Sequence, residues 1–183
     1  MEKIEDTLEQ FDTIVDECKK LFMKKMQDYG PSWTILRMPS ITDQIFIKIQ
    51  RIRSIEEKGK QKIEEGIESE FKGILNYSVI ALIQLHRLKN ENIELSHGEI
   101  EALYDTLIEE IKSLLENKNH DYGEAWREIR ISSITDFMLQ KILRIKQIEN
   151  NEGKVLVSEG VDAGYQDLVN YSVFALIRLS ENE

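Results

Sequence analysis

Apolar residues recur at steps of three and four positions over most of the chain, a period that predicts α-helices rather than strands. In the first half the pattern covers residues 5–26, 40–57 and 67–88, which we expect to form three helices. The third stretch is apolar almost all round between residues 71 and 85, so protein must cover it on most sides. We therefore expect it to be the central helix of its unit.

The ends of the predicted helices carry stop and start signals. The Tyr-Gly-Pro sequence at residues 29–31 should end the first helix, because proline cannot continue a helix interior. Ser40 with Asp43, and Ser96 with Glu99, both resemble the capping box, in which a serine and an acid three residues later satisfy free N–H groups. We expect a helix to begin at each serine.

The same pattern is written a second time. Residues 28–56 align with residues 121–149 at an offset of 93 (121 − 28), and many aligned positions are identical. Residues 76–83 (NYSVIALI) align with residues 170–177 (NYSVFALI) at an offset of 94 (170 − 76). The chain is thus predicted to be a tandem duplication of one three-helix unit.

Six helices, three in each unit, make an all-α bundle the expected fold. We divide the chain into a first repeat (residues 1–88), a linker (89–99) and a second repeat (100–183). One such unit would bury only a modest core, so the copies should share one, with their third helices packed about a pseudo-twofold axis. A short apolar run at residues 155–157 is compatible with an extended piece that is too short to imply a sheet.

Composition and charge narrow the classes of partner. The chain has 183 residues, a net charge of −10 and a pI of about 5.0, which disfavours nucleic-acid binding because phosphate contacts need clustered Lys and Arg. The single cysteine, Cys18, excludes an intrachain disulfide, and no apolar run is long enough to span a bilayer. We expect a cytoplasmic protein without membrane partners, either a monomeric pseudo-dimer or a homodimer.

Asn76 and Asn170 occupy equivalent positions within the apolar third helices. A buried amide without partners costs about 1–3 kcal/mol, so each must find one. One interpretation is a structural hydrogen bond to a neighbouring helix, and the other is contact with a ligand or a metal-bound water. Asn170 is a candidate catalytic residue together with Asp167, which lies three positions earlier on the same helix face.

Carboxylates on converging helices are how bundles build sites for hard metal ions such as Mg²⁺. Asp167 lies among apolar residues, and Glu159 and Asp162 precede it near the start of the same helix, so these three are the candidate metal ligands. The alternative is that the two earlier acids belong to a solvated helix start favoured by the helix dipole. Gly73 replaces the aspartate in the first repeat, where we therefore expect a degenerate site.

A second duplicated set is a candidate for substrate binding. Lys141 and Arg144 lie at i, i+3 on one helix face and suit phosphate, and the alternative is a salt bridge to an acid on a neighbouring helix. The turn after the fourth helix adds four candidates, which are Lys118, Asp121, Tyr122 and Trp126. An aromatic ring at this turn either stacks on a base or plugs the end of the bundle.

Three motifs carry a resemblance to a known family. In the second repeat they read Lys-x-x-Asp-Tyr-Gly at residues 118–123, Lys-x-x-Arg-Ile at residues 141–145 and Asp-Leu-x-Asn-Tyr at residues 167–171. The set resembles the nucleotide modification associated domain 1 family, a domain of unknown function, in tandem form. The third-helix motif is also similar to the acidic helix of MazG-like all-α nucleoside triphosphate pyrophosphatases, although Gly164 stands where those proteins carry a further acid.

The resemblance implies two hypotheses about function. In the first, the protein is a Mg²⁺-dependent nucleoside triphosphate pyrophosphohydrolase: carboxylates led by Asp167 hold the metal, the cations hold the phosphates, and Asn170 orients the ligand or a water. In the second, the protein is a non-catalytic module that binds a nucleotide or assembles with a partner, and the motif residues are mostly structural.

Overall fold

The computed structural model describes residues 2–58, 66–156 and 159–181, and within these ranges the chain is helical without a strand, which confirms the all-α prediction. The elements in this part of the chain are α1 (Glu2–Tyr29), η1 (Ser32–Ile35), α2 (Met38–Lys58), α3 (Ile67–Lys89), α4 (His97–Tyr122), η2 (Ala125–Glu128), α5 (Ile131–Asn150) and α6 (Val161–Ser180), where η denotes a 3-10 helix. None of these described helices combines the length and the apolar character needed to cross a membrane.

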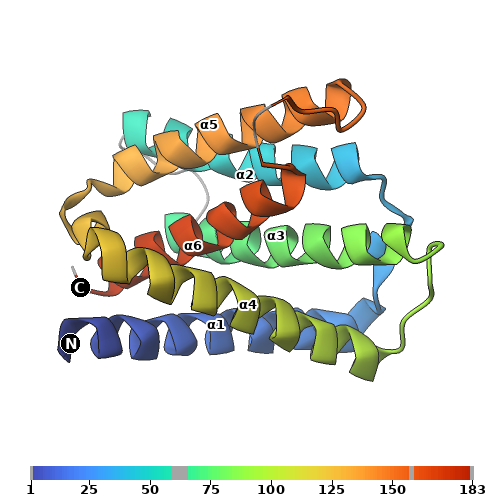
Figure 1. The fold of residues 1–183 in the computed structure, drawn as a ribbon, viewed down its shortest axis with the longest axis horizontal. Coiled ribbons are helices and arrows are strands. Elements are labelled where there is room, and N and C mark those ends of the chain that lie inside the picture. The colour runs from blue at the N-terminus through green and yellow to red at the C-terminus, as the bar shows by residue number, and fades with distance from the viewer. Residues whose placement is uncertain (1, 59–65, 157–158, 182–183) are drawn as a thin grey trace.

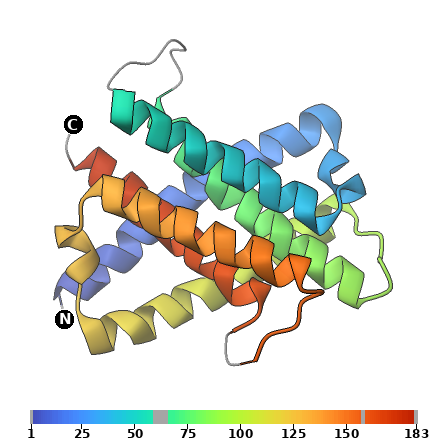
Figure 2. The ribbon, with the colours of Figure 1, turned by 90° about the horizontal axis from the view of Figure 1, so that it is seen from above.

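The helices form three layers, each built from equivalent helices of the two repeats (Figure 1). The middle layer consists of α3 and α6, with α2 and α5 on one side and α1 and α4 on the other. Seen from above, α2 and α5 lie side by side over the central pair, and α1 crosses beneath them (Figure 2). The third helix of each repeat is thus covered on both sides, which explains why its sequence is apolar almost all round.

Helix α3 begins and ends close to its predicted bounds of 67–88, and α4 begins directly after Ser96 as predicted. Ser96 opens α4 with the predicted capping box: its hydroxyl accepts from the Glu99 N–H, and the Glu99 carboxylate accepts from the Ser96 N–H at 2.8 Å. In the link before α6, Val155 and Leu156 form no strand, whereas residues 157–158 and the earlier link at residues 59–65 lie outside the described ranges.

The predicted helix start at Ser40 is wrong, because α2 begins at Met38, and the equivalent helix α5 likewise begins at Ile131, two residues before Ser133. Pro39 lies in the first turn of α2, where a missing N–H needs no partner within the helix. The proline is therefore accommodated inside the helix, and the chain turns helical before it reaches the serine.

Equivalent contacts between the two repeats demonstrate the predicted pseudo-twofold arrangement. The Thr42 hydroxyl donates to Glu149 Oε1 at 2.7 Å, and the Thr135 hydroxyl donates to Glu56 Oε1 at 2.9 Å. Both members of the second contact are offset by 93 positions from their counterparts (135 − 42 and 149 − 56). Each repeat therefore offers a threonine near the start of one helix to a glutamate near the end of the opposite helix, which joins α2 to α5 twice.

The layer formed by α1 and α4 shows the same pseudo-twofold symmetry in its ion pairs. Lys19 Nζ lies 2.8 Å from the Asp105 carboxylate, and Lys112 Nζ lies 2.7 Å from the Asp12 carboxylate, so both pairs join α1 to α4. All four side chains are partly exposed, and each pair therefore contributes little free energy. Their main effect is to favour one register of the two helices.

The two glutamates between α2 and α5 should make stability depend on pH. Burial raises the pKa of Glu56 and of Glu149, because the interior disfavours the charged carboxylate. A carboxyl group whose pKa rises on folding destabilises the folded protein when ionised, so stability should fall as the pH rises above the ordinary glutamate value of 4.5. Glu149→Gln keeps an acceptor for Thr42 without the charge. It should raise the melting temperature at about pH 7, with a smaller difference at about pH 4. A variant that melts lower than the wild type at both pH values would contradict this account.

Candidate functional site

Each repeat has a hollow where the end of its first helix, the following 3-10 turn and its third helix meet. In the second repeat this hollow is a pocket of about 190 Å³ between α4, η2 and α6, which we call the second-repeat pocket. Its lining includes four predicted site residues, which are Lys118, Trp126, Asp167 and Asn170. Residues from three separate segments of the sequence therefore meet around one pocket.

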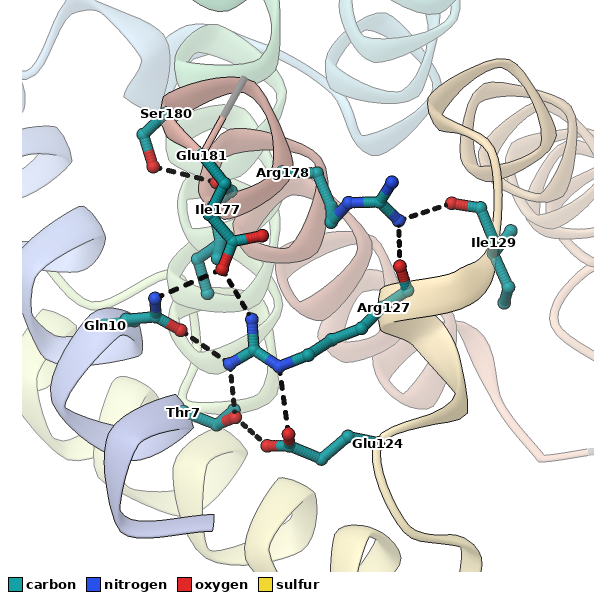
Figure 3. A network of polar contacts seen from close by, with 9 residues as sticks. All are labelled: Thr7, Gln10, Glu124, Arg127, Ile129, Ile177, Arg178, Ser180 and Glu181. Atoms are coloured by element: carbon teal, nitrogen blue, oxygen red, sulfur yellow. Dashed lines mark hydrogen bonds and ion pairs between the residues drawn. The ribbon is translucent and has the colours of Figure 1, made fainter. Parts of the chain in front are cut away.

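Side chains from the third helix hold the 3-10 turn of each repeat. In the first repeat Gln84 Nε2 donates to two carbonyl oxygens in and just after η1, at 3.0 and 2.9 Å. In the second repeat the equivalent Arg178 donates to the carbonyls of Arg127 and Ile129, the latter at 2.7 Å (Figure 3). These bonds fix the turn against the central layer and so position the tryptophan that each turn carries.

A further network braces η2 against α1 (Figure 3). The Arg127 guanidinium donates to four side-chain oxygens, those of Glu124 (2.9 Å), Glu181 (2.7 Å), Thr7 (2.9 Å) and Gln10 (2.6 Å). Thr7 and Gln10 belong to the first repeat, so this brace joins the two copies. The first repeat has Thr34 at the position equivalent to Arg127, and there Arg87 of α3 also donates to the Thr34 carbonyl, at 3.2 Å.

Three buried polar atoms around the second-repeat pocket have no hydrogen-bond partner among the described residues. They are Nδ2 of Asn119, Nε1 of Trp126 and Oδ1 of Asn170, and all three residues line the pocket. An unsatisfied buried polar group costs about 1–3 kcal/mol, and native proteins contain few of them. Two donors and one acceptor on residues that line this pocket therefore lack a partner in the described structure.

The two equivalent asparagines differ in their partners. Asn76 donates from Nδ2 to the Cys18 carbonyl at 2.9 Å and accepts from the Tyr104 hydroxyl at 2.9 Å, so its amide is satisfied within the bundle. Tyr104 comes from the opposite repeat, and its counterpart on α1 is Phe11, which has no hydroxyl. The structural interpretation therefore describes Asn76, whereas Asn170 lacks the equivalent donor.

Asp167 lies between two lysines at the second-repeat pocket. Its carboxylate is 2.8 Å from Lys141 Nζ and 3.3 Å from Lys118 Nζ. Asp167 also borders a second, shallow depression whose lining includes Lys141, Arg144 and Glu159. One carboxylate thus separates a pocket that carries amide groups from a depression that carries cations.

The carboxylates predicted to bind Mg²⁺ do not converge on one point. Asp162 turns back toward Gly160 at the start of α6, as expected for an acid favoured by the helix dipole. Within the described ranges no group of three or more His, Cys, Asp or Glu side chains could hold a metal ion. A metal site formed by Glu159, Asp162 and Asp167 therefore stays a prediction.

Trp126 is buried, and its ring stacks on Phe174 with centroids 4.4 Å apart and an interplanar angle of 9°. The Arg127 guanidinium lies 4.4 Å from the centroid of the same ring. This position fits the interpretation in which the aromatic residue plugs the end of the bundle, and it leaves Nε1–H as the polar group of the side chain. The side chains of Asp121 and Tyr122 lie outside the described part of the structure, so their binding role stays a prediction.

The acid of the first repeat lies one helical turn away from that of the second. Glu70 is buried, and its carboxylate accepts from an arginine of α2 and lies 3.4 Å from Lys48 Nζ. The first repeat has an acid followed three positions later by a glycine, Glu70 and Gly73, whereas the second repeat has the glycine first, Gly164, and then the acid, Asp167. Each repeat therefore keeps one acid, and in both the acid pairs with the lysine of the second helix.

Asn119 and Phe174 are among the residues of the second-repeat pocket that sequence reasoning missed. Asn119 replaces the buried Met26 of the first repeat, and a polar residue at a core position of the repeated pattern is a signal that could have revealed it. Phe174 replaces Ile80 within an apolar helix, and this exchange carries no signal of its own.

Comparison with known proteins agrees with the duplication. A family model described as nucleotide modification associated domain 1 matches residues 25–85 and again residues 118–179, which together make up more than half of the chain. Each match covers most of the residues that line the hollow of one repeat. No curated protein and no solved structure matches the chain.

Proposed function

The chain belongs to the nucleotide modification associated domain 1 family, and on that premise we propose that it is a nucleotide-binding protein whose second repeat holds the ligand. The observation that carries this proposal is the set of three unpartnered buried atoms, on Asn119, Trp126 and Asn170, around the second-repeat pocket in the described structure. Two donors and an acceptor suit the edge of a nucleobase, which presents groups of both kinds.

The cations beside the pocket would hold the phosphates. Lys118 and Lys141 share the charge of Asp167, and Arg144 is exposed and forms no ion pair with any residue that the structure describes. Together with Asp167 and Glu159, these three cations form a cluster with a net positive charge, although the whole chain has a net charge of −10. A locally positive surface attracts an anion such as a phosphate group. With the base in the pocket and the phosphates beyond Asp167, one nucleotide would span both depressions.

Binding is better supported than hydrolysis. A Mg²⁺-dependent pyrophosphohydrolase of the MazG-like type needs carboxylates around a metal ion. Asp167, the predicted catalytic partner of Asn170, instead contacts two lysines. Turnover therefore stays a prediction from the sequence, and a non-catalytic module would share the same binding step.

We expect ribo- or deoxynucleotides to raise the melting temperature, because a ligand that binds only the folded state stabilises it by mass action. Calorimetric titration then gives the affinity. Asn170→Ala should weaken it about tenfold, which corresponds to about 1.4 kcal/mol, the scale of one hydrogen bond. Titrations with and without Mg²⁺, followed by an assay for pyrophosphate, test hydrolysis in the same samples.

Asn90→Ala is the matched control, because Asn90 is an exposed amide at the end of α3 that lines neither hollow. It should leave the affinity unchanged. If the nucleotide binds saturably and Asn170→Ala does not weaken its binding, the ligand binds outside the second-repeat pocket. No nucleotide-dependent shift at about millimolar concentration would overturn the proposal.

A further inference from the structure

A cavity of about 740 Å³ lies in the first repeat, at the place equivalent to the second-repeat pocket. We call it the first-repeat cavity, and its lining comes from α1, η1, α2 and α3. Cavities of about this size enclose cofactors and drug-sized ligands, whereas the second-repeat pocket, at about 190 Å³, encloses only part of one. The repeat that the sequence marks as degenerate therefore has the larger hollow.

Two exchanges between the repeats explain the difference in size. Gly73 replaces Asp167, so the carboxylate that divides the second site has no counterpart, and the two depressions are joined in one cavity. Ile80 replaces Phe174, and an aliphatic side chain cannot stack on the tryptophan of the turn as Phe174 does. The cavity thus follows from the loss of a carboxylate and a ring.

The walls of the first-repeat cavity are mostly apolar and include four aromatic side chains, Phe22, Tyr29, Trp33 and Tyr77. Nε1 of Trp33 is buried and lacks a hydrogen-bond partner within the described ranges. Ile35 also lines the cavity and is 86 % exposed, so apolar surface continues outward from it. These walls suit a ring that carries a hydrogen-bond acceptor.

Two lysines of the cavity lining are available to an anion. Lys25 is exposed and forms no ion pair with the residues that the structure describes. Lys48 Nζ lies 5.8 Å from the centroid of the Tyr77 ring and 3.4 Å from Glu70, whose other carboxylate oxygen accepts from Arg51. Because Arg51 makes the closer contact with Glu70, Lys48 can also serve a ligand beside the aromatic wall.

We propose that the first-repeat cavity is a second binding site, which takes an aromatic anion. The ring would lie against the aromatic walls and accept from Trp33, and the anionic group would bind Lys25 and Lys48. A nucleoside monophosphate and an aromatic carboxylate share this chemistry. The inference does not depend on the function proposed for the second repeat, because the two hollows have no lining residue in common.

The fluorescent aromatic sulfonate 8-anilinonaphthalene-1-sulfonate is the probe. We expect it to bind the folded protein saturably, and Gly73→Asp to weaken that binding about tenfold or more. A Cβ at this position would lie 3.0 Å from the flexible Lys48 side chain, so an aspartate here would occupy the cavity and pair with Lys48, as Asp167 pairs with Lys141.

Ile80→Phe is a second variant with the same expected loss, and it serves if Gly73→Asp folds poorly. Its phenylalanine should stack on Trp33 and fill the cavity. Gly98→Asp is the matched control, because Gly98 lies in the first turn of α4, outside both hollows, and a Cβ there meets nothing within 4 Å. Circular dichroism checks that each variant is folded.

Competition with adenosine monophosphate and with benzoate distinguishes a nucleotide from a simple aromatic carboxylate. Probe binding that both cavity variants weaken, and the control does not, supports the inference whichever competitor displaces the probe. Equal affinity in the wild type and in both folded cavity variants would overturn it. So would the absence of saturable binding of the probe and of both competitors to the wild type. Loss of nucleotide binding in Asn170→Ala reports on the other hollow, so the two proposals can fail separately.

Discussion

Replacing Glu70 by alanine should lower the free energy of unfolding by about 3 kcal/mol, at the lower end of the range for breaking a buried ion pair. Glu70 is 4 % exposed, accepts from Arg51 and lies 3.4 Å from Lys48 Nζ. Without the carboxylate, two neighbouring cations lose their counter-charge. Both retain some contact with solvent, with side chains 25 % and 30 % exposed, and this limits the loss. Urea unfolding followed by circular dichroism measures the change.

The arrangement of the second repeat suggests a rescue of this variant. There the acid lies one turn later, at Asp167, and its carboxylate is 2.8 Å from Lys141 Nζ. Adding Gly73→Asp to Glu70→Ala places a carboxylate at the equivalent position, and it should restore part of the lost stability. A double-mutant cycle measures this coupling. Additive effects, or a loss below about 0.5 kcal/mol for Glu70→Ala, would contradict the ion-pair explanation.

Tyr104→Phe should destabilise the protein by about 1–3 kcal/mol, because it leaves the buried Oδ1 of Asn76 without a donor. The Tyr104 hydroxyl donates to this oxygen at 2.9 Å, and burial raises the pKa of Tyr104, so the hydroxyl stays protonated at neutral pH. Phenylalanine keeps the ring and its packing against Phe22, so the variant isolates the hydrogen bond. The measurement is the midpoint of urea unfolding, compared with that of the wild type at an unchanged slope of unfolding free energy against urea concentration.

Phe11→Tyr is the reciprocal variant. By the pseudo-twofold symmetry its hydroxyl lies near Oδ1 of Asn170, and the new hydrogen bond should raise the free energy of unfolding by about 1 kcal/mol. The hydroxyl would also take the acceptor that we assign to the nucleotide, so affinity should fall as stability rises. If Phe11→Tyr stabilises the protein but leaves the nucleotide affinity unchanged, Oδ1 of Asn170 does not contact the nucleotide. Wild-type stability in Tyr104→Phe would argue against the structural role of Asn76.

Much of the candidate site follows from the internal repeat. Lys118, Trp126, Asp167 and Asn170 fall in segments that the alignment of the two copies picks out, and the fold brings all four to one pocket. Their contacts do not follow from that alignment, because it carries no information about partners on other helices. Asp167 contacts two lysines from different helices. Trp126 packs on Phe174, whose counterpart in the first repeat is Ile80, and this apolar exchange gives no signal in the sequence.

The all-α fold, the duplication and the central place of the third helices can all be derived from the sequence, because periodicity and self-similarity along the chain require no knowledge of the partners. Packing in the folded bundle settles which asparagine is satisfied and which hollow is large. The first outcome depends on a hydroxyl that Tyr104 has and Phe11 lacks, and the second depends on the carboxylate of Asp167 and the ring of Phe174, where the first repeat has Gly73 and Ile80. Helices distant in the sequence bring these groups together, and hydrogen bonds and cavities depend on distance in space.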